Sequence, residues 1–141
     1  MKIYLSPKTP NQDTHHTWVS NIATLQGQLL QNEATEIICD NFLSMFSVDE
    51  ITGVLDVIIS KMRSNAELVI SEPDFNLISR QYTRDERDID NINSIFFQGS
   101  SLKSFLTLEK IVSLLGDKLS IEQKYFDNTS SKMTIKCRRS L

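Results

Sequence analysis

An amphipathic helix between two short apolar segments, in the middle of the chain, constrains the possible folds most. Residues 36–40 (EIICD) and 67–71 (ELVIS) have apolar centres of strand length. The segment between them has apolar residues at helical spacing, namely Ile51, Val54, Leu55, Ile58, Ile59 and Met62. We therefore predict a strand, a helix over residues 48–62 and a second strand. Near-continuous apolar runs are typical of parallel strands buried on both faces of a sheet.

The ends of this unit also have local signals. Ser47 and Glu50 have the spacing of a capping box, in which each residue bonds the other's backbone where a helix begins. Gly53 weakens the helix slightly but leaves its period intact. Pro73 ends the second strand, and the residues after it predict a further helix over 75–82.

The amino-terminal segments give weaker signals. Residues 2–6 (KIYLS) predict a short strand that ends before the prolines, and residues 18–22 (WVSNI) predict a second one. Residues 23–35 fit no clear pattern. His15 and His16 are adjacent, and no third ligand lies at a useful spacing, so we expect a solvated loop there and no metal site.

The carboxyl-terminal part predicts one more helix and a hairpin. Residues 83–91 (TRDERDIDN) are strongly charged and predict a solvated loop or helix end. Thr107 caps a helix over residues 108–115, which ends at Gly116. Alternation of apolar and polar residues around a polar turn then predicts an antiparallel hairpin over residues 119–138.

Length and composition exclude several classes of protein. The chain of 141 residues is long enough for one domain with a real core, and we expect a single domain over residues 1–141. The net charge of −3 indicates no nucleic-acid-binding surface. No apolar run approaches the roughly 18 residues of a membrane span, and the start of the chain is too broken for a signal peptide. We expect a cytoplasmic protein in which Cys39 and Cys137 are buried thiols.

The order strand, capped helix, strand, Pro-Asp and helix resembles a known family. The runs 42–46 (FLSMF) and 61–75 (KMRSNAELVISEPDF), with the helix between them, resemble a segment of class I (Rossmann-like) S-adenosylmethionine-dependent methyltransferases without a gap. The runs 95–99 (IFFQG) and 105–109 (FLTLE) and the final hairpin follow the same family order. The resemblance implies a truncated Rossmann-like α/β sandwich with a mostly parallel sheet and a C-terminal antiparallel β-hairpin. It also implies S-adenosylmethionine as the cofactor if the protein is active.

The first departures from the family concern the cofactor. The family has a glycine-rich turn after its first strand, where the backbone comes close to the cofactor. Residues 5–10 (LSPKTP) contain no glycine and two prolines at this place. The family's second strand ends in an acidic residue that accepts hydrogen bonds from the ribose. The closest polar residue here is Asn21, which lacks the charge.

Further departures remove titratable groups and whole elements. The family's Glu-His pair is Ser44-Met45 here, so a candidate general base is absent. Its double glycine is Asn65-Ala66, and Asn tolerates the left-handed turn that glycine allows. A full class I domain places two helices and two more strands between its first strand and the strand equivalent to 36–40. The interval here is about half as long, so at least one helix, and a strand with it, should be missing.

Asp40 and Asn41 are the best site candidates in the sequence. They follow a parallel strand, where α/β proteins place ligands, but they fit a turn that leaves the strand equally well. With Ser6 and Asn21 they form the set that could contact a cofactor. Asp74 fits the first turn of the next helix, where the helix dipole stabilises a carboxylate. We predict no catalytic residue and no metal ligand.

Two functions follow from these departures. The first is a degenerate methyltransferase-like domain that lacks independent catalysis, binds no cofactor and acts as a binding, accessory or structural subunit. The second is a minimal active methyltransferase whose cofactor pocket a second subunit would complete, since methyl transfer needs mainly proximity and alignment. A truncated sheet should also expose apolar surface, so we expect self-association or a protein partner. A domain this compact would suit a phage or mobile-element genome.

Overall fold

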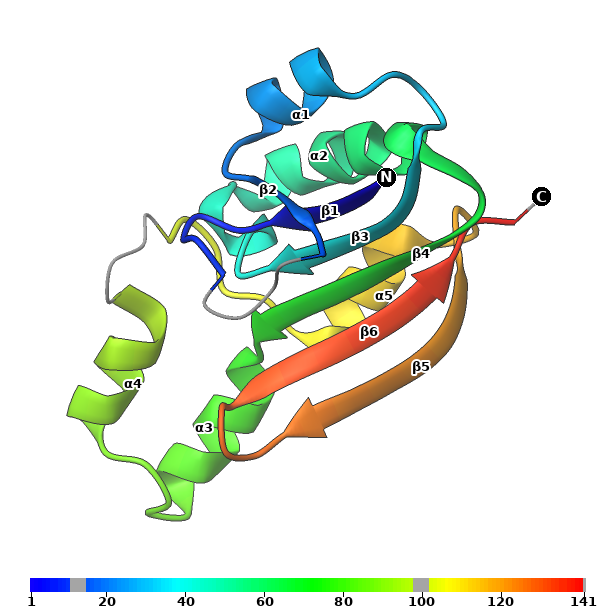
Figure 1. Ribbon diagram of the computed structural model, residues 1–141. Helices are drawn as coiled ribbons and strands as arrows, with labels where there is room; N and C mark the ends of the chain where they lie inside the picture. Colours follow the sequence, from blue (N-terminus) through cyan, green and yellow to red (C-terminus); the bar gives the residue numbers. More distant parts are fainter. Residues whose placement is uncertain (11–14, 98–101, 141) are drawn as a thin grey trace.

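The computed structural model describes residues 1–10, 15–97 and 102–140, which are arranged around a six-stranded sheet (Figure 1). The strands are β1 (Lys2–Leu5), β2 (Thr17–Val19), β3 (Ala34–Asp40), β4 (Met62–Pro73), β5 (Ser120–Asp127) and β6 (Lys132–Arg138). The helices are α1 (Ile22–Gln28), the 3-10 turn η1 (Leu43–Met45), α2 (Val48–Lys61), α3 (Phe75–Thr83), α4 (Ile89–Phe97) and α5 (Leu108–Leu115).

The strand order across the sheet is β2-β1-β3-β4-β6-β5. The first four strands in this order run parallel, and β6 and β5 add an antiparallel hairpin at one edge. This arrangement confirms the predicted α/β fold with a mostly parallel sheet and a C-terminal hairpin. The central unit of β3, α2 and β4 lies where the hydrophobic pattern predicts it, and the Glu50 carboxylate accepts hydrogen bonds from the Ser47 backbone N–H at 3.3 Å and hydroxyl at 2.8 Å.

One face of the sheet is buried over its central strands. Its inward side chains come from four neighbouring strands, namely Ile3, Leu5, Ile37, Cys39, Leu68, Ile70, Met133, Ile135 and Cys137. Helices α1, α2 and α5 cover this face (Figure 1) and contribute apolar residues to the same core, among them Leu25, Leu55 and Ile111. Burial of these side chains supplies most of the stabilisation of the fold, at roughly 1.5–3 kcal/mol for each large apolar residue.

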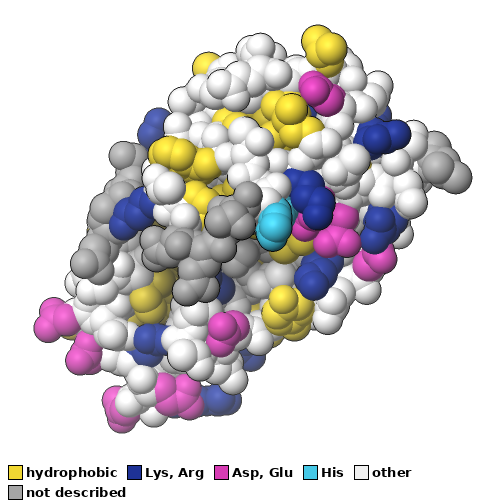
Figure 2. Space-filling view, in the orientation of Figure 1, with side chains coloured by type: hydrophobic (Ala, Val, Ile, Leu, Met, Phe, Trp, Pro, Cys, Tyr) yellow, Lys and Arg dark blue, Asp and Glu magenta, His cyan; other side chains and the backbone are white. Residues whose placement is uncertain are grey.

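The opposite face, which we call the open face, is covered by no helix of the described residues. Ile38 and Val69 point to it and are only half-buried. The prediction that the parallel strands are buried on both faces is therefore wrong. Ion pairs cross this face instead, between Arg138 and Glu67 at 3.2 Å and between Lys2 and Glu36 at 3.8 Å. Basic and acidic side chains accordingly lie next to each other in Figure 2, so much of this face is polar.

The amino-terminal part differs from the prediction in its details. The second predicted strand, residues 18–22, is the shorter β2, because Asn21 already begins helix α1: its side chain accepts a hydrogen bond from the Thr24 N–H at 2.8 Å. Between β1 and β3, the described residues form one strand and one helix. A full class I domain would have two of each there, so the structure agrees with the predicted truncation.

Helix α4 was not expected from the sequence. The charged run 83–91 was predicted to be a loop or helix end, but α4 begins inside it, at Ile89. The Asp88 carboxylate accepts a hydrogen bond from the Asn91 N–H at 2.8 Å and so caps the first turn. Asp88 and Asp90 of this run therefore lie at a helix start, where the dipole favours negative charge.

A buried carboxylate joins two helices to the end of β4. Asp74 follows Pro73, and its side chain is fully buried. One oxygen accepts a hydrogen bond from the Leu77 N–H of α3 and the other from the Leu108 N–H of α5, both at 2.8 Å. Two helix N-termini therefore share one negative charge, which satisfies donors that would otherwise be buried without partners.

We expect the variant Asp74→Ala to lower the free energy of unfolding by about 2–4 kcal/mol, because it leaves two buried N–H groups without acceptors. Asp74→Asn keeps one acceptor oxygen and should lose about half of that. The matched control is Asp88→Ala, which removes an exposed cap of one helix and should cost about 1 kcal/mol. Urea unfolding followed by circular dichroism measures all three. Equal losses for Asp74→Ala and Asp88→Ala would contradict the double role.

Candidate functional site

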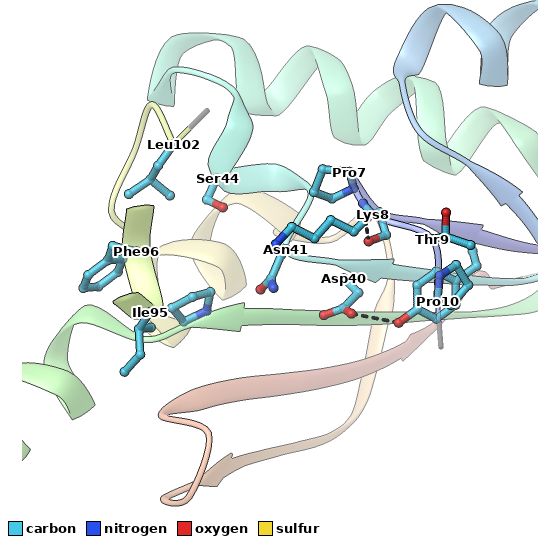
Figure 3. Close-up of a pocket in the computed structure, with 13 residues that line it drawn as sticks. Pro7, Lys8, Thr9, Pro10, Asp40, Asn41, Ser44, Ile95, Phe96 and Leu102 are labelled. Atoms are coloured by element: carbon cyan, nitrogen blue, oxygen red, sulfur yellow. Dashed lines mark hydrogen bonds between the residues drawn. The ribbon is translucent and has the colours of Figure 1, made fainter. Parts of the chain in front are cut away.

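A cavity lies at the carboxyl end of the parallel strands, as expected for an α/β sheet (Figure 3). It has a volume of about 330 Å³. One side is formed by the loop 6–10 that follows β1, and the floor by Asp40 and Asn41 at the end of β3. The opposite side is apolar and consists of Ile95 and Phe96 from α4 together with Leu102.

Three of the four predicted contact residues meet in this cavity, and the fourth lies elsewhere. Ser6, Asp40 and Asn41 line it, although their strands are separated by more than thirty residues in the sequence. Asn21 does not line it, because its side chain is the N-cap of α1. Whether any of the four binds a cofactor stays a prediction.

Both carboxylate oxygens of Asp40 are already bound within the chain. The Tyr4 hydroxyl on β1 donates a hydrogen bond to Oδ2 at 2.7 Å, and the Lys132 ammonium on β6 contacts Oδ1 at 2.6 Å. The Asp40 and Lys132 side chains are about three-quarters buried, so this ion pair is partly shielded from water. Asp40 on β3 therefore connects to β1 through Tyr4 and to β6 through Lys132.

The loop after β1 has few free donors. The Ser6 hydroxyl accepts a hydrogen bond from the Lys8 N–H at 3.2 Å, and the Ser6 carbonyl accepts one from the Trp18 indole at 3.0 Å. The Ser6 N–H donates to the Val19 carbonyl at 3.2 Å. Pro7 and Pro10 have no N–H. This loop therefore cannot present the row of backbone donors with which a glycine-rich turn holds an anion.

Asn41 has a backbone role. Its φ of 51° is in the left-handed region, which Asn tolerates better than most residues. Its N–H donates to the Ser71 carbonyl at 2.9 Å, so the chain turns sharply from β3 into η1. The structure thus supports the turn interpretation of Asp40-Asn41, while both side chains still reach the cavity.

Sequence reasoning missed a second buried carboxylate near the cavity. Glu72 at the end of β4 is fully buried, and its Oε1 accepts hydrogen bonds from the Leu43 N–H at 2.7 Å and the Ser44 N–H at 3.2 Å. Its Oε2 accepts from the Ser44 hydroxyl at 3.2 Å. Burial raises the pKa of Glu72 to about 7, and these hydrogen bonds and Lys132 only partly oppose that rise. Glu72 holds η1, whose Ser44 lines the cavity.

Other candidate groups are structural in the part of the chain that the structure describes. No cluster of three His, Cys, Asp or Glu residues that could hold a metal occurs there, and none of its helices is long and apolar enough to cross a membrane. Cys39 and Cys137 are buried, and burial raises the pKa of both thiols. His16 is not in a solvated loop: its side chain is mostly buried, with Nε2 3.3 Å from the Glu36 carboxylate.

Comparison with solved structures identifies the fold. The chain is similar to a magnesium protoporphyrin IX methyltransferase (ChlM) from Synechocystis PCC 6803 with bound SAH, at a TM-score of 0.56 and 16% identity over 90% of this chain and 54% of that one. It is also similar to a SAM-dependent methyltransferase from Methanosarcina mazei, at a TM-score of 0.57 and 16% identity, over 94% of this chain and 73% of that one.

A third similar structure is the N-methyltransferase NodS from Bradyrhizobium japonicum WM9 in complex with S-adenosyl-L-homocysteine, at a TM-score of 0.52 and 13% identity, over 89% of this chain and 55% of that one. The sequence matches no protein-family model and no curated protein. The chain therefore has the class I SAM-dependent methyltransferase fold, and it spans about half the length of the Synechocystis and Bradyrhizobium proteins.

The residues at the strand ends do not fit S-adenosylmethionine in the way this fold ordinarily holds it. The loop after β1 has no glycine, and the Ser6 and Lys8 N–H groups already donate to the Val19 carbonyl and the Ser6 hydroxyl. Asp40, the carboxylate that lies in the cavity, has one oxygen on Tyr4 and the other on Lys132. A ligand that needed Asp40 as an acceptor would have to compete with a phenol and an ammonium group. The contacts of Asp40 with Tyr4 and Lys132 therefore oppose the binding of S-adenosylmethionine through this carboxylate.

The buried Glu72 predicts a specific pH dependence of stability. The folded pKa of Glu72, about 7, lies above the usual glutamate pKa of 4.5. Protonated Glu72 therefore stabilises the fold fully below the usual pKa, and this stabilisation is lost as pH rises through the folded pKa. Between about pH 5 and about pH 8 the free energy of unfolding of the wild type should fall by about 2–3 kcal/mol relative to Glu72→Gln. Gln keeps an acceptor oxygen for Leu43 and Ser44.

Urea unfolding at several pH values measures this difference. The control is Glu86→Gln, because Glu86 is exposed. Its pH profile should follow the wild type. Parallel profiles for the wild type and Glu72→Gln would show that the buried carboxyl group does not titrate in this range.

Proposed function

We propose that this chain is a non-catalytic domain of methyltransferase fold, which acts in the cytoplasm as a binding, accessory or structural subunit. One observation carries the proposal: at the strand ends, where this fold binds its cofactor, the side chains of Asp40 and Ser6 are bound to other groups of the chain. Asp40 holds Tyr4 and Lys132, and the hydroxyl of Ser6 holds its own loop. A preorganised ligand site would instead leave such groups free to face the ligand.

A minimal active methyltransferase is the second candidate. The cavity of about 330 Å³ favours it, because this volume lies at the lower end of the range for small-molecule sites. The Asp40–Lys132 pair is also not completely buried, so it could open. In this function Ser6, Asp40 and Asn41 would contact S-adenosylmethionine, Asn21 would have to move toward it, and a second subunit would complete the pocket.

Isothermal titration with S-adenosylmethionine and with S-adenosylhomocysteine separates the two functions. We expect no heat and no shift in melting temperature at millimolar ligand, because each ligand must displace contacts within the chain. Micromolar binding that is lost in Asp40→Ala and kept in Asp56→Ala would refute the non-catalytic proposal. Asp56 is a suitable control, because its carboxylate is exposed and pairs with Lys118 away from the cavity.

A further inference from the structure

The buried side chain of Ser44 connects a titratable carboxyl group to the cavity at the strand ends. Its hydroxyl donates a hydrogen bond to Glu72 Oε2 at 3.2 Å. Ser44 is also one of the residues that line the cavity, together with Asn41 and Leu102 (Figure 3). One side chain of η1 therefore contacts both a group that can gain or lose a proton and the wall of a candidate ligand site.

Glu72 is a buried carboxyl group without an ion-pair partner among the described residues. Lys132 on β6 favours its charged form, but this ammonium group contacts Asp40 Oδ1 at 2.6 Å. Burial outweighs Lys132 and raises the pKa of Glu72 to about 7, so this group exchanges a proton near neutral pH. The charged groups on the elements around Glu72 and the cavity include Lys8, Asp40, Asp74, Lys103 and Lys132, together with the thiol of Cys39 on β3.

The hydrogen bonds of Glu72 determine which of its oxygens can take up the proton. Oε1 accepts hydrogen bonds from the Leu43 N–H at 2.7 Å and from the Ser44 N–H at 3.2 Å, and backbone hydrogens cannot turn away. The partner of Oε2 is the Ser44 hydroxyl, which can either donate or accept. A proton from solvent therefore belongs on Oε2, and the neutral carboxyl group then donates to the Ser44 oxygen.

We propose that the protonation state of Glu72 decides whether Ser44 accepts or donates a hydrogen bond at the cavity wall. With Glu72 charged, the carboxylate holds the Ser44 hydrogen, and the Ser44 oxygen can only accept a bond from the cavity. With Glu72 neutral, that oxygen accepts the carboxyl hydrogen, and the Ser44 hydrogen turns toward the cavity. The neutral state thus favours a ligand with an acceptor group, and the charged state favours one with a donor group. The proposal holds whether or not the cavity binds S-adenosylmethionine.

The backbone of η1 should stay in place while the hydroxyl turns. Both N–H groups on Oε1 keep their acceptor in either protonation state, because the proton is on the other oxygen. The Ser44 carbonyl also accepts hydrogen bonds from the Lys103 N–H at 2.8 Å and from the Ser104 N–H at 3.2 Å. These contacts distinguish a turning hydroxyl from a loop that opens as a whole.

NMR spectra of the full chain between about pH 5.5 and about pH 8.5 test the proposal. We expect the backbone N–H signals of Leu43 and Ser44 and the side-chain amide signals of Asn41 to shift with one midpoint near pH 7. These shifts should be lost in Glu72→Gln. In Ser44→Ala the Leu43 signal should still shift, whereas the Asn41 side-chain signals should not, because the hydroxyl that connects them to Glu72 is gone.

The matched control is Ser60→Ala, which removes a hydroxyl that donates to the Val57 carbonyl within α2, and it should follow the wild type. His16, whose ring centroid lies 6.4 Å from that of Tyr4, is kept in Glu72→Gln, so shifts that remain in this variant belong to other groups. Circular dichroism checks that each variant is folded. If Glu72→Gln does not fold, the wild type and Ser44→Ala decide between the outcomes by themselves.

Three results would overturn the proposal. The first is a wild type whose Leu43 and Ser44 signals do not shift in this range. The second is an Asn41 side-chain shift that persists in Ser44→Ala, because the charge of Glu72 would then act on the cavity without the hydroxyl. The third is a loss of hydrogen-exchange protection at Lys103 and Ser104 on the acidic side of the midpoint, which would show that η1 moves as a whole.

Discussion

The carboxylate of Asp74 is the contact on which the rest of the carboxyl-terminal half depends. It lies at the end of β4 and binds the first turns of α3 and α5 with separate oxygens. The Asp74 backbone N–H donates to the Ser131 carbonyl at the start of β6. A single residue therefore sets the positions of two helices and the terminal hairpin relative to the parallel sheet. The Pro-Asp pair, which is part of the family resemblance, thus has a role in folding.

The elements that sequence reasoning located are those whose signals are local. The helix α2 has its own apolar period and capping box, and Gly116, with a φ of 52°, ends α5 as predicted. Asn65 has a φ of 66°, which explains how Asn can replace a glycine at that turn. Helix α4 was missed because its apolar residues follow a charged run, and only one of them, Phe96, is buried, so the sequence has no clear core-facing pattern there.

The candidate site could be predicted only in part for a related reason. The topology of parallel strands brings Ser6, Asp40 and Asn41 to one edge, and this follows from recognising the strands. The partner of Asp40 could not be predicted, because Lys132 lies 92 positions away and no sequence pattern links the two. Glu72 is an acidic residue for which no buried role was predicted, yet alternation along β4 turns it into the core, where η1 supplies donors for it. Local composition misleads at such positions.

The positions of the polar groups that are bound within the chain, and of the apolar side chains that are exposed, support the proposed non-catalytic role. At the strand ends, carboxylates bind Tyr, Lys and backbone N–H groups of the same chain, and these contacts help to hold the sheet together. On the open face, ion pairs between neighbouring strands make the exposed sheet compatible with water. Of the large apolar side chains that remain exposed, Phe75, Tyr82, Ile89 and Phe97 lie on α3 and α4, and the others are spread over the described residues. In this domain the carboxylate at the strand ends is already bound within the chain, and large apolar side chains are exposed on α3 and α4. Such a domain is better suited to binding another chain than to binding a small cofactor.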